Sequence, residues 1–158
     1  MTIRLERAGL GDAAEILRLQ VASFRPLLEK YGDERTNPAN DRLEDIVRRL
    51  RQPQTVYFFI VRGDSRIGAI RVVFEAESKR ARISPMFIAP PYQGQGHGQR
   101  AIQLVEEEVG AARWELSTIL EEEGNCRFYE KLGYRRGGGE RHVNERMTLV
   151  DYTKETGG

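Results

Sequence analysis

The chain has 158 residues, of which 25 are Lys or Arg and 24 are Asp or Glu, and its formal net charge at pH 7 is +1. A charge so close to zero excludes the strong positive field of many nucleic-acid-binding proteins, and no apolar run approaches the ~20 residues that span a membrane. The single cysteine, Cys126, excludes an internal disulfide, and the N-terminus lacks the apolar core of a signal peptide, so we expect a cytoplasmic protein. The length favours a single domain, residues 1–158, in which residues 152–158 form a frayed tail.

The N-terminal residues predict a strand, a helix and a loop. Residues 2–7 alternate apolar and polar side chains, as a half-buried strand does. Asp12 fits the N-cap of a helix that we expect to end before Pro26, because proline disfavours helical geometry in the residue that precedes it. Residues 30–41 are polar and rich in turn formers, which indicates a loop.

A second helix and a hairpin come next. Asp41 fits the N-cap of a helix that Pro53 closes. Residues 55–62 and 67–74 are rich in aromatic and β-branched side chains, and a Gly-Asp-Ser turn separates them. This pattern is typical of a β-hairpin.

A further strand, residues 81–88, leads into a glycine-rich loop and a helix over residues 98–112. Pro85 lies inside this strand. Because proline cannot donate a hydrogen bond to a neighbouring strand, it marks an edge, a bulge or a break.

The C-terminal part predicts a strand at residues 114–120 and a short helix at residues 125–132. Two strands then end the chain, at residues 134–136 and 146–152, with the glycine run 137–139 between them. The order of the elements favours an α+β, or mixed α/β, fold with helices on the faces of one sheet.

The glycine-rich loop, residues 92–98, has the composition of an anion site. Glycine allows positive φ and close approach of the backbone, and the free amides of the following helix face a bound anion. The dinucleotide fingerprint would need glycine where Gln99 stands, and the Lys-Ser/Thr of a Walker loop is missing. The expected ligand carries phosphate; the alternative is a tight turn before a helix.

Two motifs together resemble the GNAT superfamily of acetyl-CoA-dependent N-acetyltransferases. Gln93, Gly96 and Gly98 match its Gln-x-x-Gly-x-Gly loop, and residues 128–134, Phe-Tyr-Glu-Lys-Leu-Gly-Tyr, match its Phe-Tyr-Glu-Lys-x-Gly-Phe/Tyr block. The resemblance implies a GNAT-type fold, with a central, mostly antiparallel sheet of about seven strands, a splayed central pair and helices on both faces. It also implies acetyl transfer to a primary amine by direct attack in a ternary complex.

The resemblance assigns acetyl-CoA to the loop and to the strand before it. Six residues would bind the pyrophosphate: Gln93, Gly94, Gln95, Gly96, His97 and Gly98. Backbone groups of Met86, Phe87 and Ile88 would pair with the pantetheine arm, and a bulge at Pro85 would free an N–H as an oxyanion donor.

Two roles are open for Asn125. The asparagine that often contacts pantetheine in the family falls on Glu122 here, and Asn125 lies one helical turn nearer to Tyr129. Asn125 therefore either binds the cofactor or caps the short helix.

Tyr129 would be the general acid. A departing thiolate has an ordinary pKa of ~8.5 and a phenol ~10, so proton transfer between them is feasible. The alternative for Tyr129 is a tyrosine packed on a helix face, and we expect Phe128 and Tyr134 to lie in the core. A tyrosine at position 129 favours catalysis over the second candidate function, a coenzyme A-binding sensor or regulatory module without turnover.

The general base is open. The acceptor ammonium, with an ordinary pKa of ~10.4, must lose a proton before attack. Candidates are Glu75, which ends a predicted strand, and Glu122, in a run of three glutamates that is otherwise a solvated turn.

Metal and covalent chemistry have little support in the sequence. The two histidines, His97 and His142, are isolated and make no metal site, so acetyl-CoA is the only cofactor that we expect. Cys126 is either a buried small side chain or, less simply, an acetyl-carrying nucleophile.

The acceptor is a small-molecule or peptide amine, and nothing in the sequence identifies it further. We expect residues 25–40 to line the acceptor side, where Glu29, Asp33 and Glu34 would attract an amine. We expect no nucleic-acid or membrane partner, and a monomer or a homodimer.

Overall fold

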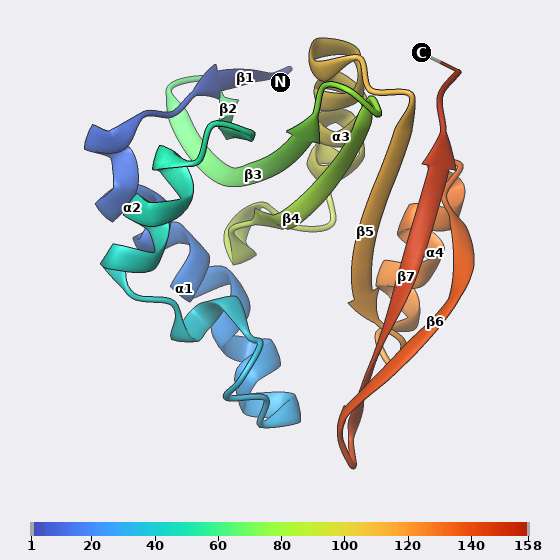
Figure 1. The fold of residues 1–158 in the computed structure, drawn as a ribbon. Coiled ribbons are helices and arrows are strands. Elements are labelled where there is room, and N and C mark those ends of the chain that lie inside the picture. Colours follow the sequence, from blue (N-terminus) through green and yellow to red (C-terminus); the bar gives the residue numbers. More distant parts are fainter. Residues whose placement is uncertain (1, 158) are drawn as a thin grey trace.

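A computed structural model describes residues 2–157, which form one seven-stranded sheet with helices on both faces (Figure 1). The strand order is β1-β2-β3-β4-β5-β7-β6, and every pair is antiparallel except β4 and β5. The elements are β1 (Ile3–Arg7), α1 (Ala13–Tyr31), α2 (Leu43–Arg51), β2 (Thr55–Arg62), β3 (Ser65–Glu75), β4 (Arg80–Ile88), α3 (His97–Val109), β5 (Arg113–Ile119), α4 (Glu123–Lys131), β6 (Arg135–Asn144) and β7 (Met147–Glu155). This order and the mixed α/β class confirm the prediction. None of the helices within residues 2–157 is long and apolar enough to cross a membrane.

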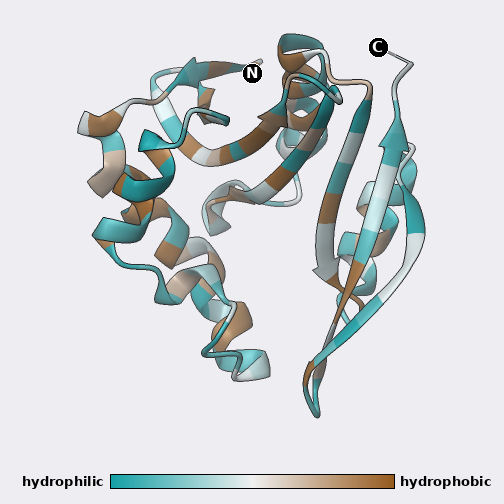
Figure 2. Cartoon of the chain, viewed as in Figure 1, coloured by the Kyte–Doolittle hydropathy of each residue, from teal (hydrophilic) through white to brown (hydrophobic). Residues whose placement is uncertain are grey.

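The sheet has two hydrophobic cores, one on each face. Helices α1 and α2 cover one face, where Ile16 and Ile46 are fully buried against side chains such as Phe59. Helix α3 covers the other face with Ile102 and Val105, and Figure 2 shows apolar stretches both in the helices and along the strands that they cover. Burying one such side chain contributes roughly 1.5–3 kcal/mol, so both helix layers are firmly held.

The sheet opens in its middle. Strand β4 pairs with β5 only where Arg80–Arg82 lies beside Arg113–Glu115, and Figure 1 shows the two strands separating beyond that point. The β3–β4 register shifts opposite Pro85, between Ile70 and Val72, which confirms the predicted bulge. A proline here has no N–H to give to β3, so the ladder is interrupted where the splay begins.

The predicted end of the first helix is wrong. Helix α1 continues through Pro26 to Tyr31 and ends at Gly32, whose φ is 66°. Packing overrides the helix-breaking tendency of proline, because the Phe24 ring packs edge-on against Phe87 at 5.6 Å and Leu27 joins a cluster with Tyr31. The predicted loop is correspondingly shorter.

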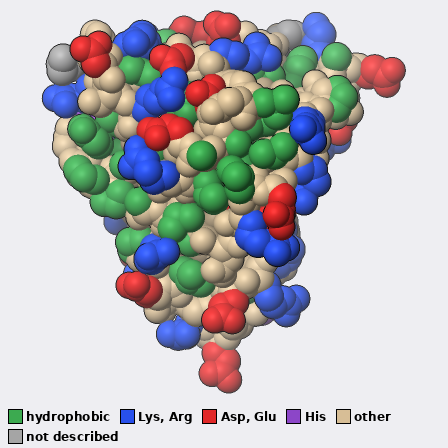
Figure 3. Space-filling view, turned by 90° about the vertical axis from the view of Figure 1, so that its left-hand side faces the viewer, with side chains coloured by type: hydrophobic (Ala, Val, Ile, Leu, Met, Phe, Trp, Pro, Cys, Tyr) green, Lys and Arg blue, Asp and Glu red, His purple; other side chains and the backbone are tan. Residues whose placement is uncertain are grey.

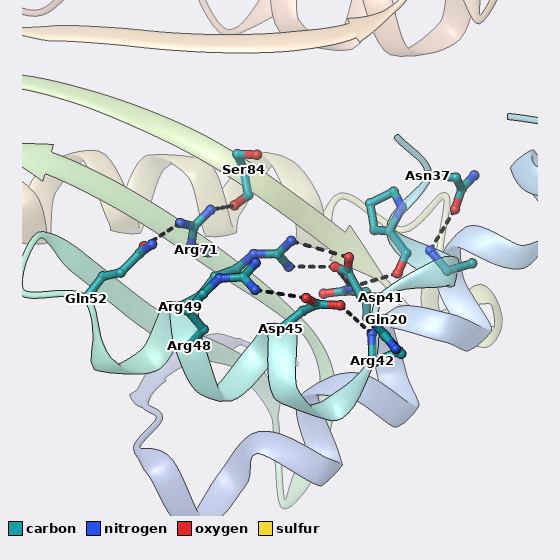
Figure 4. A network of polar contacts seen from close by, with 12 residues as sticks. Gln20, Asn37, Asp41, Arg42, Asp45, Arg48, Arg49, Gln52, Arg71 and Ser84 are labelled. Carbon is teal, nitrogen blue, oxygen red and sulfur yellow. Dashed lines mark hydrogen bonds and ion pairs between the residues drawn. The ribbon is translucent and has the colours of Figure 1, made fainter. Parts of the chain in front are cut away.

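The predicted cap of the second helix is also wrong. Helix α2 starts after Arg42, whose N–H donates to Asp45 at 2.8 Å. Asp41 instead accepts hydrogen bonds from Gln20 of α1 at 2.7 Å and from Arg49 of α2 at 2.5 Å (Figure 4). It therefore ties the two helices together.

The surface on the side of α1 and α2 carries no large patch of positive or of negative charge. Figure 3 shows basic and acidic side chains interspersed across it. The arginines of α2 illustrate this, since Arg48 pairs with Asp45 and Arg49 pairs with Asp41.

The C-terminal hairpin is longer than predicted. Glycines 137–139 lie inside β6, where its register with β7 is irregular, and the hairpin turns at residues 145–146. Strand β7 runs to Glu155 and pairs with β5 along its length, so the frayed-tail prediction is wrong for residues 152–155. The last residue of that predicted tail, Gly158, lies outside the described residues.

Candidate functional site

The glycine loop between β4 and α3 presents unpaired amides. Gly94 and Gly96 have φ of 73° and 83°, values that side-chain-bearing residues rarely adopt, and Gly96 caps α3. Within residues 2–157, no acceptor is bonded to the amides of residues 94–99. A Cβ at Gly94 or Gly96 would meet no atom within 4 Å, so the space above these amides is open. Unpaired amides at a helix N-terminus suit a phosphate.

The side chains of the loop mainly hold the loop itself. The Gln93 amide donates to the Ile88 carbonyl at 2.8 Å, and the Gln95 amide donates to the Pro91 carbonyl at 3.3 Å. His97 Nε2 lies 3.3 Å from Gln95 Oε1. The backbone amides are therefore the groups that this loop leaves available to an anion.

A groove of about 560 Å³ runs from this loop along the end of β4. We call it the loop-side groove. It is lined by all the predicted cofactor residues except Gln95, namely Met86, Phe87, Ile88, Gln93, Gly94, Gly96, His97, Gly98, Asn125 and Tyr129. Gly98 is needed for packing, because a Cβ there would lie 3.3 Å from Phe128 and 3.4 Å from Met86.

At the end of β4, every second residue directs its backbone N–H and C=O away from β3, into the opening between β4 and β5. The Ala89 N–H donates to Ile67 of β3 at 2.7 Å, and backbone groups alternate in direction along a strand. Met86 and Ile88 therefore direct their backbone groups away from β3, as the bond from Gln93 to Ile88 also indicates. Phe87 directs its backbone toward β3, so only its side chain is available to the groove.

A half-buried arginine holds the bulge. Arg71 lies in β3 at the register shift, and its guanidinium donates to the Ser84 carbonyl at 2.8 Å and to Gln52 Oε1 at 3.0 Å (Figure 4). Burial lowers the pKa of Arg71. The guanidinium fixes the strand just before Pro85, and so it positions the Met86 N–H that faces the splay.

Tyr129 has a free hydroxyl. The neighbouring tyrosines donate to carboxylates, Tyr134 to Glu106 at 2.9 Å and Tyr152 to Glu130 at 2.8 Å. The Tyr129 hydroxyl makes no hydrogen bond to any residue in the described range 2–157. Burial raises the pKa of Tyr129 to about 12, so the phenol carries its proton at neutral pH and is a weaker acid than an ordinary tyrosine.

A second cavity, of about 310 Å³, occupies the opening between β4 and β5, and we call it the splay cavity. It shares five lining residues with the loop-side groove: Phe24, Leu27, Met86, Asn125 and Tyr129. Tyr129 therefore lies where the two spaces meet.

The walls of the splay cavity come from several elements. The segment predicted for the acceptor side contributes Asp33, Thr36, Asn37 and Pro38, but neither Glu29 nor Glu34. Sequence reasoning missed the side chains of the opposite wall, among them Arg82, Ser117 and Arg141.

Asn125 does not cap the short helix. It is the third residue of α4, and the cap position belongs to Glu122. The Asn125 side chain is exposed and lines both the loop-side groove and the splay cavity. The capping alternative is therefore wrong, and cofactor contact stays a prediction.

The two candidate bases lie in different places. Glu122 lines the loop-side groove and accepts hydrogen bonds from Lys30 at 2.6 Å and from the Tyr31 hydroxyl. Burial opposes ionisation, but these hydrogen bonds prevail and lower the pKa of Glu122, which weakens it as a base. Glu75 ends β3 next to Arg80, where β4 starts, accepts from Ser78 at 3.2 Å, and lines neither space.

The remaining candidates lie away from the site. Cys126 of α4 is buried in the core and lines neither the loop-side groove nor the splay cavity. His142 is exposed, with Nδ1 3.3 Å from the Thr148 hydroxyl. The geometry offers no nucleophilic role to either residue.

Residues 14–134 match the Acetyltransferase (GNAT) family. The chain belongs to this family. Its fold is that of GNAT acetyltransferases, a family that uses acetyl-CoA, and the resemblance noted from the two motifs is confirmed. No curated protein sequence matches the chain.

Several solved structures share this GNAT fold. An acetyltransferase from Thermus thermophilus has a TM-score of 0.74 and 21% identity, over 98% of this chain and 97% of that one. The ribosomal-protein-S18-alanine N-acetyltransferase from Escherichia coli has a TM-score of 0.79 and 12% identity, over 99% and 96%. A spermidine N-acetyltransferase from Vibrio cholerae, in complex with CoA and spermine, has a TM-score of 0.77 and 17% identity, over 97% and 95%.

Proposed function

We propose that this GNAT protein is an N-acetyltransferase that moves an acetyl group from acetyl-CoA to a primary amine by direct attack in a ternary complex. The observation that carries the proposal is Tyr129, whose unpaired hydroxyl lies where the loop-side groove meets the splay cavity. The similarity to an S18-alanine and a spermidine N-acetyltransferase supports an amine as the acceptor.

The loop-side groove would hold the cofactor, which supplies an activated acetyl thioester. The amides of residues 94–99 bind its pyrophosphate, and the backbone of Met86 and Ile88 pairs with the pantetheine amides. The Met86 N–H is the donor that the bulge leaves free for the thioester carbonyl oxygen. Asn125, on the rim of the groove, offers a side-chain amide to the same arm.

The splay cavity would hold the acceptor. An amine in its neutral form attacks the thioester carbonyl from the side opposite the loop, so that a C–N bond forms and the C–S bond breaks. Tyr129 donates its proton to the departing thiolate, and the proton that the nitrogen loses passes to water, from which Tyr129 is reprotonated. Glu75 takes no part in the proposal because it lines neither space. Glu122 reaches only the loop-side groove and is weakened by its partners.

The second candidate function is a coenzyme A-binding sensor without turnover. It would need the loop-side groove but no general acid, and the free hydroxyl of Tyr129 favours the enzyme over the sensor.

A thiol-release assay with acetyl-CoA across a panel of primary amines tests the proposal. We expect one coenzyme A released for each amine acetylated, together with a raised melting temperature of the protein in coenzyme A. Tight coenzyme A binding without turnover of any amine would favour the sensor. A melting temperature indifferent to coenzyme A would contradict both functions.

A further inference from the structure

Two arginines converge on one wall of the splay cavity. Arg82 of β4 and Arg141 of β6 both donate to the Ser117 hydroxyl of β5, at 2.6 Å and 3.0 Å. Both guanidiniums line the cavity, and Ser117 lies between them.

One carboxylate, that of Asp151, is bonded to this cluster of two arginines and a serine. Asp151 of β7 accepts from Ser117 at 2.6 Å and from Arg141 at 3.0 Å. Arg82 forms no salt bridge with any carboxylate of residues 2–157, and it is half-buried. A guanidinium has five N–H donors, and the hydrogen bonds that Arg82 makes within the chain use one of its nitrogens. The cluster therefore keeps one unmatched positive charge that faces the cavity.

Within residues 2–157, the other carboxylate of the cavity, Asp33, keeps its own negative charge but forms no salt bridge with Arg82 or Arg141. Asp33 lies on the opposite wall, and its carboxylate is held by the Arg35 and Thr36 amides of its own loop, at 3.1 Å and 2.9 Å. Most of the remaining lining is apolar, for example Leu27, Leu116 and Met147. A half-buried guanidinium whose bonds within residues 2–157 leave N–H donors unused suits an anionic ligand, so Arg82 points to an anion in the cavity.

The position of Arg82 sets the distance between the reacting amine of an acceptor and its anionic group. Arg82 lies four residues before Met86 on the same strand, and because of the bulge this stretch lies beside only three steps of β3, from Ile70 to Val73, which span roughly 10 Å at ~3.3 Å per residue. The arginine side chain covers part of that length. An acceptor that places its amine at Met86 and Tyr129 therefore needs a spacer before its anionic group reaches Arg82.

We propose that the acceptor is a primary amine that carries a carboxylate at the far end of an apolar spacer, and that Arg82, with Arg141, binds this carboxylate. This inference rests on the proposed N-acetyltransferase function. An acceptor with a second ammonium in place of the carboxylate would be repelled by the same guanidiniums.

Three amines that share one reacting group test the inference: 6-aminohexanoate, hexylamine and 1,6-diaminohexane. Charge-assisted hydrogen bonds contribute about 1.5–3 kcal/mol, so kcat/KM for 6-aminohexanoate should exceed that for hexylamine roughly tenfold or more, and the diamine should be the poorest. Glycine, which lacks the spacer, should also be a poor acceptor. Equal kcat/KM for 6-aminohexanoate and hexylamine would overturn the inference while leaving the acetyltransferase intact.

The variant Arg82→Gln should remove the preference, because kcat/KM for 6-aminohexanoate should fall about tenfold more than kcat/KM for hexylamine. Arg80→Gln is the matched control, because Arg80 is on the same strand, pairs with Glu115 and lines neither space. Equal effects of the two variants would overturn the role of Arg82.

A binding measurement makes the test independent of turnover. In the presence of coenzyme A, 6-aminohexanoate should raise the melting temperature of the wild type and of Arg80→Gln, but not of Arg82→Gln. If no amine is acetylated, the proposed function fails and this comparison still decides the inference: protection lost only in Arg82→Gln upholds the anion site, and any other pattern overturns it.

Discussion

The loop-side groove and the splay cavity meet at Tyr129 but are built in different ways. The groove comes largely from one stretch of chain, residues 86–98, and uses backbone amides in conformations that glycine and proline make possible. The splay cavity takes its lining from α1 and the loop after it, from short stretches of β4 and β5, and from α4, β6 and β7. A site made of backbone leaves a mark in the sequence, whereas a site made of scattered side chains appears only when the strands are in register.

The sharpest test of this comparison is the residue that the two spaces share. Tyr129→Phe should lower kcat about 100-fold or more, since general acid catalysis typically contributes 10²–10⁴-fold. Coenzyme A affinity and stability should barely change, because the hydroxyl has no partner among the described residues. Tyr152→Phe is the control, because it removes the hydrogen bond to Glu130 and should cost about 1 kcal/mol of stability without loss of kcat. Steady-state kinetics, calorimetric binding and melting curves distinguish the two variants.

The backbone character of the loop-side groove is tested at Gly96. Gly96→Ala forces a side-chain-bearing residue into φ of 83°, which costs about 1–2 kcal/mol, so coenzyme A affinity should fall roughly tenfold. Gly110→Ala, at φ of 68° at the other end of α3, introduces the same kind of strain away from the groove. It should lower the melting temperature without changing coenzyme A affinity. Equal affinity losses in the two variants would mean that strain, not the loop, controls binding.

A substitution of Glu122 tests whether this residue of the loop-side groove is a catalytic base or a structural tether. If this carboxylate mainly tethers α1 through Lys30 and Tyr31, Glu122→Gln should change kcat by no more than about threefold and lower the melting temperature by a few degrees at most. The pKa of Glu122 is lowered in the folded protein, so its stabilisation is present above its ordinary value of 4.5 and is lost as the pH falls. A kcat loss of 100-fold would instead identify Glu122 as the base.

The smallest expected effect is in the alkaline pH profile. With a pKa of about 12, Tyr129 stays protonated, so kcat should show no alkaline loss from this residue between about pH 7 and pH 10. The stability that the neutral phenol contributes is complete below its unfolded pKa of ~10 and is lost as the pH rises through about 12. A fall in kcat near pH 8 that disappears in Tyr129→Phe would contradict this assignment.

The contrast between a groove built from backbone and a cavity built from side chains also explains what the sequence could predict. The order of the elements follows from periodicity, the bulge at Pro85 follows from the missing proline N–H, and the glycines at 94 and 96 follow from positive φ. These are local properties, and they suffice for the groove.

The errors all involve tertiary contacts. Helix α1 passes through Pro26 because Phe24 and Leu27 are packed, Asp41 leaves its expected cap to bind Arg49, and the glycine run 137–139 is held inside β6 by β7. Arg82 could not be selected from the sequence, because nothing local distinguishes it from Arg80. The β4–β5 register alone would place Arg82 beside Glu115. Only the side-chain contacts show that Glu115 pairs with Arg80, whereas Arg82 donates to Ser117 and lines the cavity.

The most direct test of the two-site account is an amide NMR titration of the protein with coenzyme A. We predict that the amide resonances of residues 94–99, together with Met86 and Ile88, shift most, and that those of Ser117, Arg141 and Asp33 in the splay cavity stay in place. Shifts centred on the splay cavity, with the amides of residues 94–99 unmoved, would contradict the assignment of the loop-side groove to the cofactor.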